Sequence, residues 1–135
     1  MITIFDPDDD YTGIEIQACT DRFAGTARVY AGLRELTDLA NQMVGFPKDH
    51  TAQLTYEFGS RSPGVAGGYC QIRLRCLDRA GHIALHVELE DEDLYWPPSS
   101  TQMTIHVEAA ETDRFIQALH ALDRERWGAA ALASL

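Results

Sequence analysis

The clearest fold signal in the sequence is YCQIRLRCLDRAGHIALHVELE, residues 69–90. Apolar and polar residues alternate on both sides of a turn at 78–81, which is typical of a hairpin of two half-buried strands. If Leu77 faces His82 across the turn, every apolar residue of one strand meets an apolar residue of the other. The same register places on the polar face Gln71, Arg73, Arg75, Ala84, His86 and Glu88. The stretch therefore predicts an antiparallel hairpin with one apolar face and one face in water.

The same alternation continues on either side of this hairpin and predicts further strands. The first two of them are expected to pair with Ile16 opposite Ala27 and Glu15 opposite Arg28. The last expected strand, 102–109, has its apolar residues on the inner face, with Ala109 as the final one. The expected strands are 14–20, 23–31, 54–58 and 102–109, with a short opening strand at Ile2–Phe5 that adds a member at the sheet edge.

Apolar residues three and four apart predict two helices. The first covers 33–44, and its buried stripe begins at Leu33. The second is expected to begin at a cap formed by Thr112 and to end at Gly128. After it, the Ala-rich residues 129–135 either extend the helix or fray.

The resulting order is β-β-α-β-β-β-β-α, with the opening strand in addition. Strands that alternate cleanly belong to antiparallel sheets, because strands buried on both faces are apolar throughout. We expect an α+β fold in which an antiparallel sheet carries two helices on one face and leaves the other face exposed. A chain of 135 residues has the length of one domain, so a single domain is expected over 1–135.

Composition excludes several classes of function. With 45% hydrophobic and 24% charged residues, the chain is globular and not disordered. Eleven Lys and Arg against 21 Asp and Glu give a net charge of −10, which disfavours nucleic acids and anionic membranes as partners. The chain shows no signal peptide or apolar span, and three cysteines do not form a secreted disulfide framework, so a cytoplasmic location is expected. Cys70 and Cys76 alternate with apolar residues and are expected in the core.

The exposed sheet face is the first candidate site. It is expected to gather Arg73, His86, Glu88 and His106. A His-carboxylate pair there suits general acid-base chemistry, whereas the alternative is a solvated lattice of charges. No nucleophile and no metal-ligand spacing accompanies these residues, so we expect no catalytic residue, no metal site and no cofactor.

The loop at 91–100 is the second candidate site. It joins the acidic residues Asp91, Glu92 and Asp93 to the aromatic residues Tyr95 and Trp96. Aromatic anchors beside carboxylates suit the binding of a basic protein. The alternative is a lid that packs over one end of the core.

Short segments of the chain resemble a family of short, uncharacterised bacterial proteins. They are Phe23-Ala24-Gly25, Val29-Tyr30, Gly45-Phe46-Pro47-Lys48, Gly68-Tyr69 and Asp78-Arg79-Ala80-Gly81-His82, and the resemblance covers about residues 22–90. It implies a bacterial origin and supplies no activity or site residue. Size, acidity and expected architecture are also similar to those of immunity proteins of bacterial toxin systems, by analogy only.

Two functions remain open from the sequence. The first is a non-catalytic interaction protein that binds a basic partner, in the manner of an immunity protein. The second is a small-molecule binding protein, or an enzyme that uses the His, Glu and Arg residues of the exposed face. A deep pocket favours the second. Self-association through a sheet edge or the exposed face is compatible with both.

Overall fold

The computed structural model describes residues 1–62, 66–92 and 98–134, and it shows an α+β fold. All strand pairs are antiparallel, which confirms the fold class expected from the sequence. The elements are β1 (Ile2–Asp6), β2 (Thr12–Cys19), β3 (Ala24–Ala31), α1 (Glu35–Met43), β4 (Gln53–Gly59), β5 (Tyr69–Cys76), β6 (His82–Glu90), β7 (Ser100–Glu108), α2 (Ala109–Glu125) and β8 (Ala129–Ala130).

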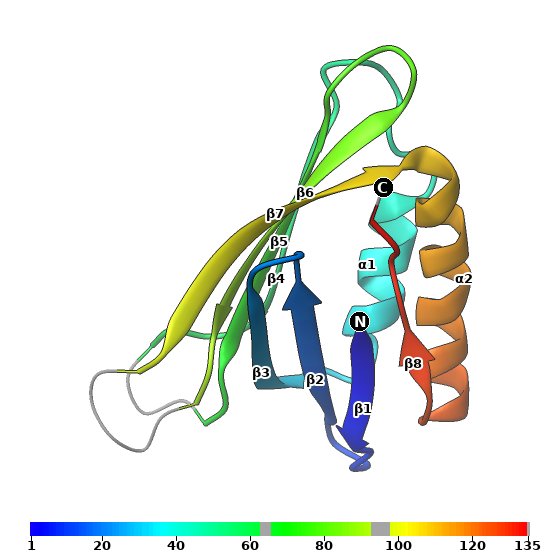
Figure 1. Cartoon of the computed structure of the whole chain (residues 1–135). Coiled ribbons are helices and arrows are strands. Elements are labelled where there is room, and N and C mark those ends of the chain that lie inside the picture. Colours follow the sequence, from blue (N-terminus) through cyan, green and yellow to red (C-terminus); the bar gives the residue numbers. More distant parts are fainter. Residues whose placement is uncertain (63–65, 93–97, 135) are drawn as a thin grey trace.

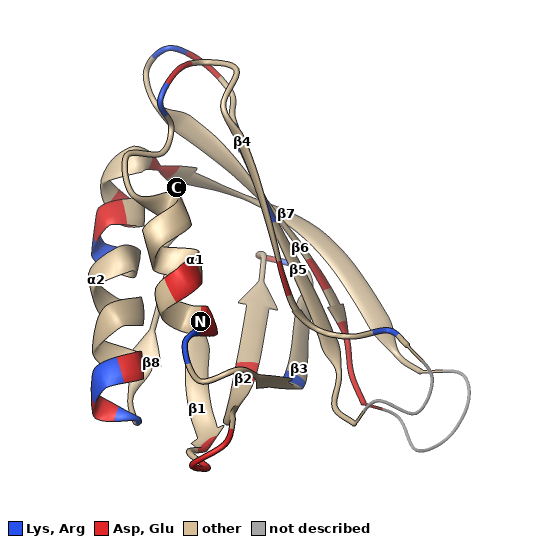
Figure 2. Cartoon of the chain, turned by 180° about the vertical axis from the view of Figure 1, so that it is seen from behind, with Lys and Arg blue, Asp and Glu red and all other residues tan. Residues whose placement is uncertain are grey.

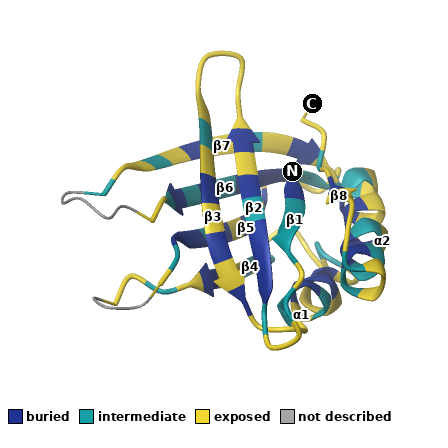
Figure 3. Cartoon of the chain, turned by 90° about the horizontal axis from the view of Figure 1, so that it is seen from below, coloured by how far each residue is buried: buried dark blue, intermediate teal, exposed yellow. Residues whose placement is uncertain are grey.

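The strands are divided between two sheets. Sheet A has the order β3-β2-β1-β8, and sheet B has the order β4-β5-β6-β7 (Figure 1). The strand pattern predicted one sheet, but α1 separates β3 from β4 along the chain, and these two strands do not pair. Figure 3 shows the strands of sheet A crossing those of sheet B. The opening strand is also not at an edge, because β1 pairs with both β2 and β8.

The registers predicted for the two hairpins are confirmed. In sheet B, Leu74 pairs with Leu85 and Arg73 with His86. In sheet A, Ile16 pairs with Ala27. These registers follow from matching apolar faces, since a shift of one residue would move each apolar set into water.

One apolar core lies between sheet A, the inner face of sheet B and the two helices, which pack against each other (Figure 1). Its fully buried side chains come from every layer, including Ile14 in sheet A, Ile83 in sheet B, Leu39 in α1 and Leu119 in α2. Cys70 is buried at 0% exposure and Cys76 at 6%, as expected, whereas Cys19 is exposed. Sheet A and the two helices therefore together cover the inner face of sheet B.

Both helices differ from expectation at their ends. Leu33 precedes α1 and is 44% exposed, so its assignment to the buried stripe was wrong. Helix α2 begins at Ala109, and Thr112 lies inside it, where its hydroxyl donates to the carbonyl oxygen of Ala109 at 2.6 Å. Thr112 is therefore buried within the helix and is not its cap. Ala109, expected as the end of a strand, is the first helical residue because β7 leads directly into α2.

The end of α2 also differs from expectation. The helix stops at Arg126, a residue with left-handed backbone (φ 64°), and not at Gly128. The Ala-rich tail then neither extends the helix nor frays at once, because Ala129 and Ala130 pair with β1 as β8. Ala130 is fully buried there.

The edge strand β3 lies very close to one end of sheet B. A Cβ added at Gly25 would come within 2.4 Å of the Thr101 methyl group on β7. At Gly68, which precedes β5, a Cβ would come within 2.4 Å of the Glu90 carbonyl oxygen and 2.9 Å of that of Arg28 on β3. The Gly68 amide also donates to the Arg28 carbonyl oxygen at 2.9 Å. Glycine is therefore required at this crossing for lack of space.

We predict that Gly68→Ala lowers the free energy of unfolding by about 2 kcal/mol or more, because the new methyl group collides with two backbone carbonyls. Gly32→Ala is the matched control, since the nearest atom to its Cβ lies 3.5 Å away. Chemical denaturation of both variants measures the difference. Equal stabilities of the two variants would contradict the close crossing.

Candidate functional site

The outer face of sheet B is turned away from sheet A and from both helices (Figure 1, Figure 3). Its side chains belong to four strands in register. They are Gln53, Thr55 and Glu57 of β4, Tyr69, Gln71, Arg73 and Arg75 of β5, His82, Ala84, His86, Glu88 and Glu90 of β6, and Gln102, Thr104, His106 and Glu108 of β7. The structure therefore places Arg73, His86, Glu88 and His106 on one face, as the alternation predicted.

Two carboxylates on this face are held together by Arg61. Its guanidinium bonds to Glu88 and lies 3.5 Å from the Glu90 carboxylate. The same guanidinium stacks over the Tyr69 ring at 4.2 Å from the ring centroid. Arg61 follows the end of β4 in the chain, and its segment has no periodicity that places it on a face. The sequence pattern therefore did not predict this contact.

The histidines of the outer face do not form the acid-base pair considered from the sequence. The Nδ1 atom of His86 lies 3.2 Å from the Thr104 hydroxyl, whereas the Glu88 carboxylate is bonded to Arg61. The Nε2 atom of His86 is buried and has no hydrogen-bond partner within the described part of the chain. A general acid or base must reach a substrate proton, and a buried nitrogen does not.

The face is polarised along its strands. Arg73 and Arg75 border a hollow of about 360 Å³ that opens beside Ala84. Glu57 of β4 and Glu88 and Glu90 of β6 lie toward the other end of sheet B, on either side of β5; acidic residues are red in Figure 2. Gln71 lies between Glu57 and Glu88 in register and donates to Glu57 at 3.2 Å.

The acidic loop is described only in part. Asp93, Tyr95 and Trp96 lie outside the described residues, so their predicted role in binding stays a prediction. Asp91 and Glu92 are exposed and follow β6 directly. One Asp91 carboxylate oxygen accepts a long hydrogen bond, 3.4 Å, from the Arg28 amide on the edge of β3. Asp91 thus also helps to cover a strand edge, which limits pairing with other chains.

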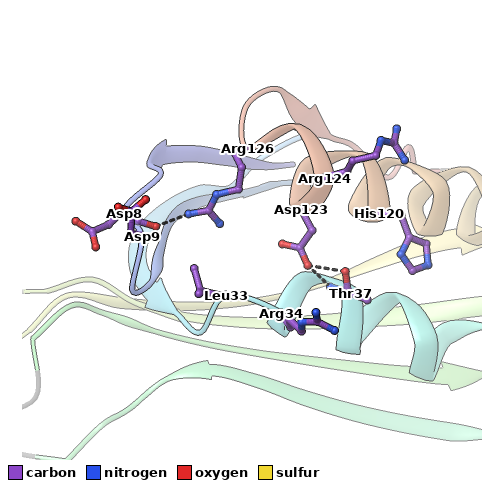
Figure 4. Close-up of a pocket in the computed structure, with 9 residues that line it drawn as sticks. All are labelled: Asp8, Asp9, Leu33, Arg34, Thr37, His120, Asp123, Arg124 and Arg126. Carbon is purple, nitrogen blue, oxygen red and sulfur yellow. Dashed lines mark hydrogen bonds between the residues drawn. The ribbon is translucent and has the colours of Figure 1, made fainter.

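A second candidate is a polar groove of about 430 Å³ between the β1–β2 loop, α1 and α2 (Figure 4). Asp123 and His120 of α2 border it, together with Arg34 and Arg126. In Figure 4 the Asp123 carboxylate points toward Thr37 of α1. Two of the residues that border the groove, Asp123 and Arg126, are engaged in contacts within the protein.

Asp123 caps α1 from the neighbouring helix. Its Oδ2 atom accepts hydrogen bonds from the Thr37 amide at 2.8 Å and from the Thr37 hydroxyl at 2.6 Å. Thr37 is the third residue of α1, and Arg34, the residue before the helix, provides no side-chain cap. An amide in the first turn has no partner within its own helix, so this carboxylate satisfies it and interacts favourably with the helix dipole. Such a cap 86 residues away in the chain has no local sequence signal.

Arg126 ties the end of α2 to the β1–β2 loop. Its guanidinium donates to the Thr12 hydroxyl and to the carbonyl oxygens of Asp8 and Tyr11. Thr12 is fully buried. The left-handed backbone at Arg126 turns its side chain off the helix axis toward these acceptors (Figure 4). The groove is therefore built by contacts that stabilise the fold.

We predict that Asp123→Ala lowers the free energy of unfolding by about 1 to 2 kcal/mol, because two donors of Thr37 lose their acceptor. Asp113→Ala is the matched control, since Asp113 is exposed on the same helix. Urea titrations followed by circular dichroism measure both values. If Asp123→Ala were as stable as Asp113→Ala, the cap would contribute nothing.

The turn at 78–81 carries an exposed ion pair. The Nδ1 atom of His82 lies 2.6 Å from the Asp78 carboxylate. The hydrogen bond to Asp78 raises the pKa of His82 above its ordinary value of 6.5, and the same bond lowers the pKa of Asp78 below 3.8. The contribution of His82 to stability is present below pH 6.5 and is lost as the pH rises through its raised pKa. That of Asp78 is present above pH 3.8 and is lost as the pH falls through its lowered pKa.

We predict that Asp78→Asn returns the pKa of His82 toward 6.5, because the neutral amide stabilises imidazolium less than the carboxylate does. An NMR titration of the His82 ring protons measures it. Asp49→Asn removes a carboxylate that bonds to Thr51 instead and serves as the control. A His82 titration that is the same in wild type and Asp78→Asn would rule out the pair in solution.

Metal ligands and known proteins add no further site within the described part of the chain. Among the described residues, no group of three His, Cys, Asp or Glu side chains is placed to hold a metal ion. None of the helices in the described part of the chain is long and apolar enough to cross a membrane. No family model, curated protein or solved structure matches the chain. Any functional conclusion therefore depends on the chemistry of the faces themselves.

Proposed function

We propose that this chain is a non-catalytic binding protein that recognises a basic protein partner through the outer face of sheet B. The observation that supports this most is the Arg61 contact, which holds Glu88 and Glu90 in fixed positions on an uncovered face. Fixed side chains lose little conformational entropy on binding. Arg61 is exposed, and arginine is a residue type that often dominates binding energy in interfaces, whereas Tyr69 is buried beneath it.

The charge pattern of the face favours one orientation of the partner. Glu57, Glu88 and Glu90 lie toward one end of the face. Asp91 and Glu92 follow Glu90 in the chain. Arg73 and Arg75 lie toward the other end. A partner with basic residues opposite the acidic end, and acidic residues opposite the arginines, would dock in one direction only. Such complementarity raises association rates and selects among partners more than it raises affinity.

The test compares two variants of equal net charge in capture of a basic partner from the source cell. Glu88→Gln with Glu90→Gln neutralises the proposed surface, and Glu111→Gln with Glu125→Gln neutralises two ion-paired carboxylates on α2. We predict that only the first pair weakens capture, by about tenfold or more. Equal capture by both pairs, or equal loss, would contradict the proposal, because total charge would then explain the result.

The alternative of an enzyme at the same residues has less support. His86 is hydrogen-bonded to Thr104 and not to a carboxylate, and Glu88 is hydrogen-bonded to Arg61 and not to a histidine. His106 lies opposite Ala84 and is exposed. An open sheet face also lacks the exclusion of water that most catalysis needs. Likeness to an immunity protein and self-association through a sheet edge both stay predictions, and the same capture experiment with mass spectrometry reports on them.

A further inference from the structure

The side chains between the two sheets and the helices do not fill all the space that they enclose. A cavity of about 390 Å³ lies there, within the range of roughly 300 to 1,000 Å³ that is typical of small-molecule sites. Ile16 and Ala18 line it from sheet A, Leu85 and Ile105 from sheet B, and Phe115 from α2. It lies on the inner side of sheet B, away from the surface proposed above for a protein partner.

The chemistry of the lining excludes a polar occupant. Apolar side chains from both sheets and both helices make up most of it. A charged group does border it, because Met1 is among the lining residues and its α-amino group donates to the Gln17 carbonyl oxygen at 2.8 Å. The polar side chains are those of Gln17, Cys19 and Ser134. A buried water needs two to four polar partners, so the inner part of such a space stays dry or holds an apolar molecule.

The cavity reaches solvent at one side. Gln17, Cys19, Ala133 and Ser134 line it and are exposed. Figure 3 shows the end of β2 and both labelled ends of the chain on the same side of the fold, near β7. Residues 131–134 form neither helix nor strand, although Leu132 packs against the core. An entering molecule would therefore displace no strand or helix at this side.

We propose that this cavity binds one small apolar molecule. At about 30 Å³ for each heavy atom, the volume accommodates about 13 of them. The molecule would lie among Leu85, Ile105 and Phe115. A hydroxyl group at its end would lie at the exposed side, where Gln17, Cys19 and Ser134 line the cavity.

The test uses 1-decanol as the probe in isothermal titration calorimetry. We expect one molecule per chain with a dissociation constant on the order of 10 µM. Ala18→Leu extends a side chain into the cavity and should weaken binding by about tenfold or more while the protein stays folded. Ala84→Leu makes the same change on the outer face of sheet B and should leave binding unchanged.

Alkylation of Cys19 gives a second measurement on the unmodified chain. Its exposed thiol lines the mouth of the cavity, so bound decanol should slow its reaction with iodoacetamide. Cys70 does not compete, because it is buried and burial raises the pKa of its thiol to about 12.

Several results would overturn the proposal. Absence of both heat and Cys19 protection would show that the cavity does not take an apolar molecule. Binding that Ala18→Leu leaves unchanged would place the alcohol elsewhere. A loss of capture in the Glu88 and Glu90 variant has no bearing on this cavity, so the two proposals fail separately.

Discussion

The close crossing of β3 over one end of sheet B determines the arrangement of the other layers. At this crossing, Gly25 faces the Thr101 methyl group, and Gly68 lies between the carbonyl oxygens of Arg28 and Glu90. The hydrogen bond from the Gly68 amide to the Arg28 carbonyl joins the two sheets through their backbones. Because neither glycine has a side chain, the sheets approach closely here, and the helices and β8 close the other side (Figure 1).

This arrangement gives sheet B two faces with different roles. Its inner face forms the core and borders a cavity in which Leu85 and Ile105 meet Phe115. Its outer face meets solvent and carries fixed charges. Not all of the acidic residues are free to attract a partner, because Asp123 caps α1, Asp78 pairs with His82 and Asp91 covers a strand edge. The net charge of −10 therefore overstates the available acidic surface. Glu88 and Glu90 are themselves paired with Arg61, which leaves one net negative charge held in a fixed position.

Local patterns in the sequence predicted the features that depend on residues close together in the chain. Alternation gave both hairpin registers and the outer face that holds Arg73, His86, Glu88 and His106. Contacts between distant segments could not be predicted in this way. The two sheets are separate because β3 and β4 do not pair. The addition of β8 to sheet A has no local signal, because a pair of alanines does not indicate a strand. The Asp123 cap, the Arg61 contact and the cavity likewise arise only when the layers are assembled.

The crossing is tested most directly by a nuclear Overhauser effect between the Hα protons of Gly25 and the γ-methyl group of Thr101. A Cβ at Gly25 would lie 2.4 Å from that methyl carbon, so one Hα proton must be close to the methyl protons. The account predicts a strong cross-peak in a spectrum of the folded protein. Its absence, with the cross-peaks between β6 and β7 intact, would show that sheet B is formed but that β3 does not cross it there.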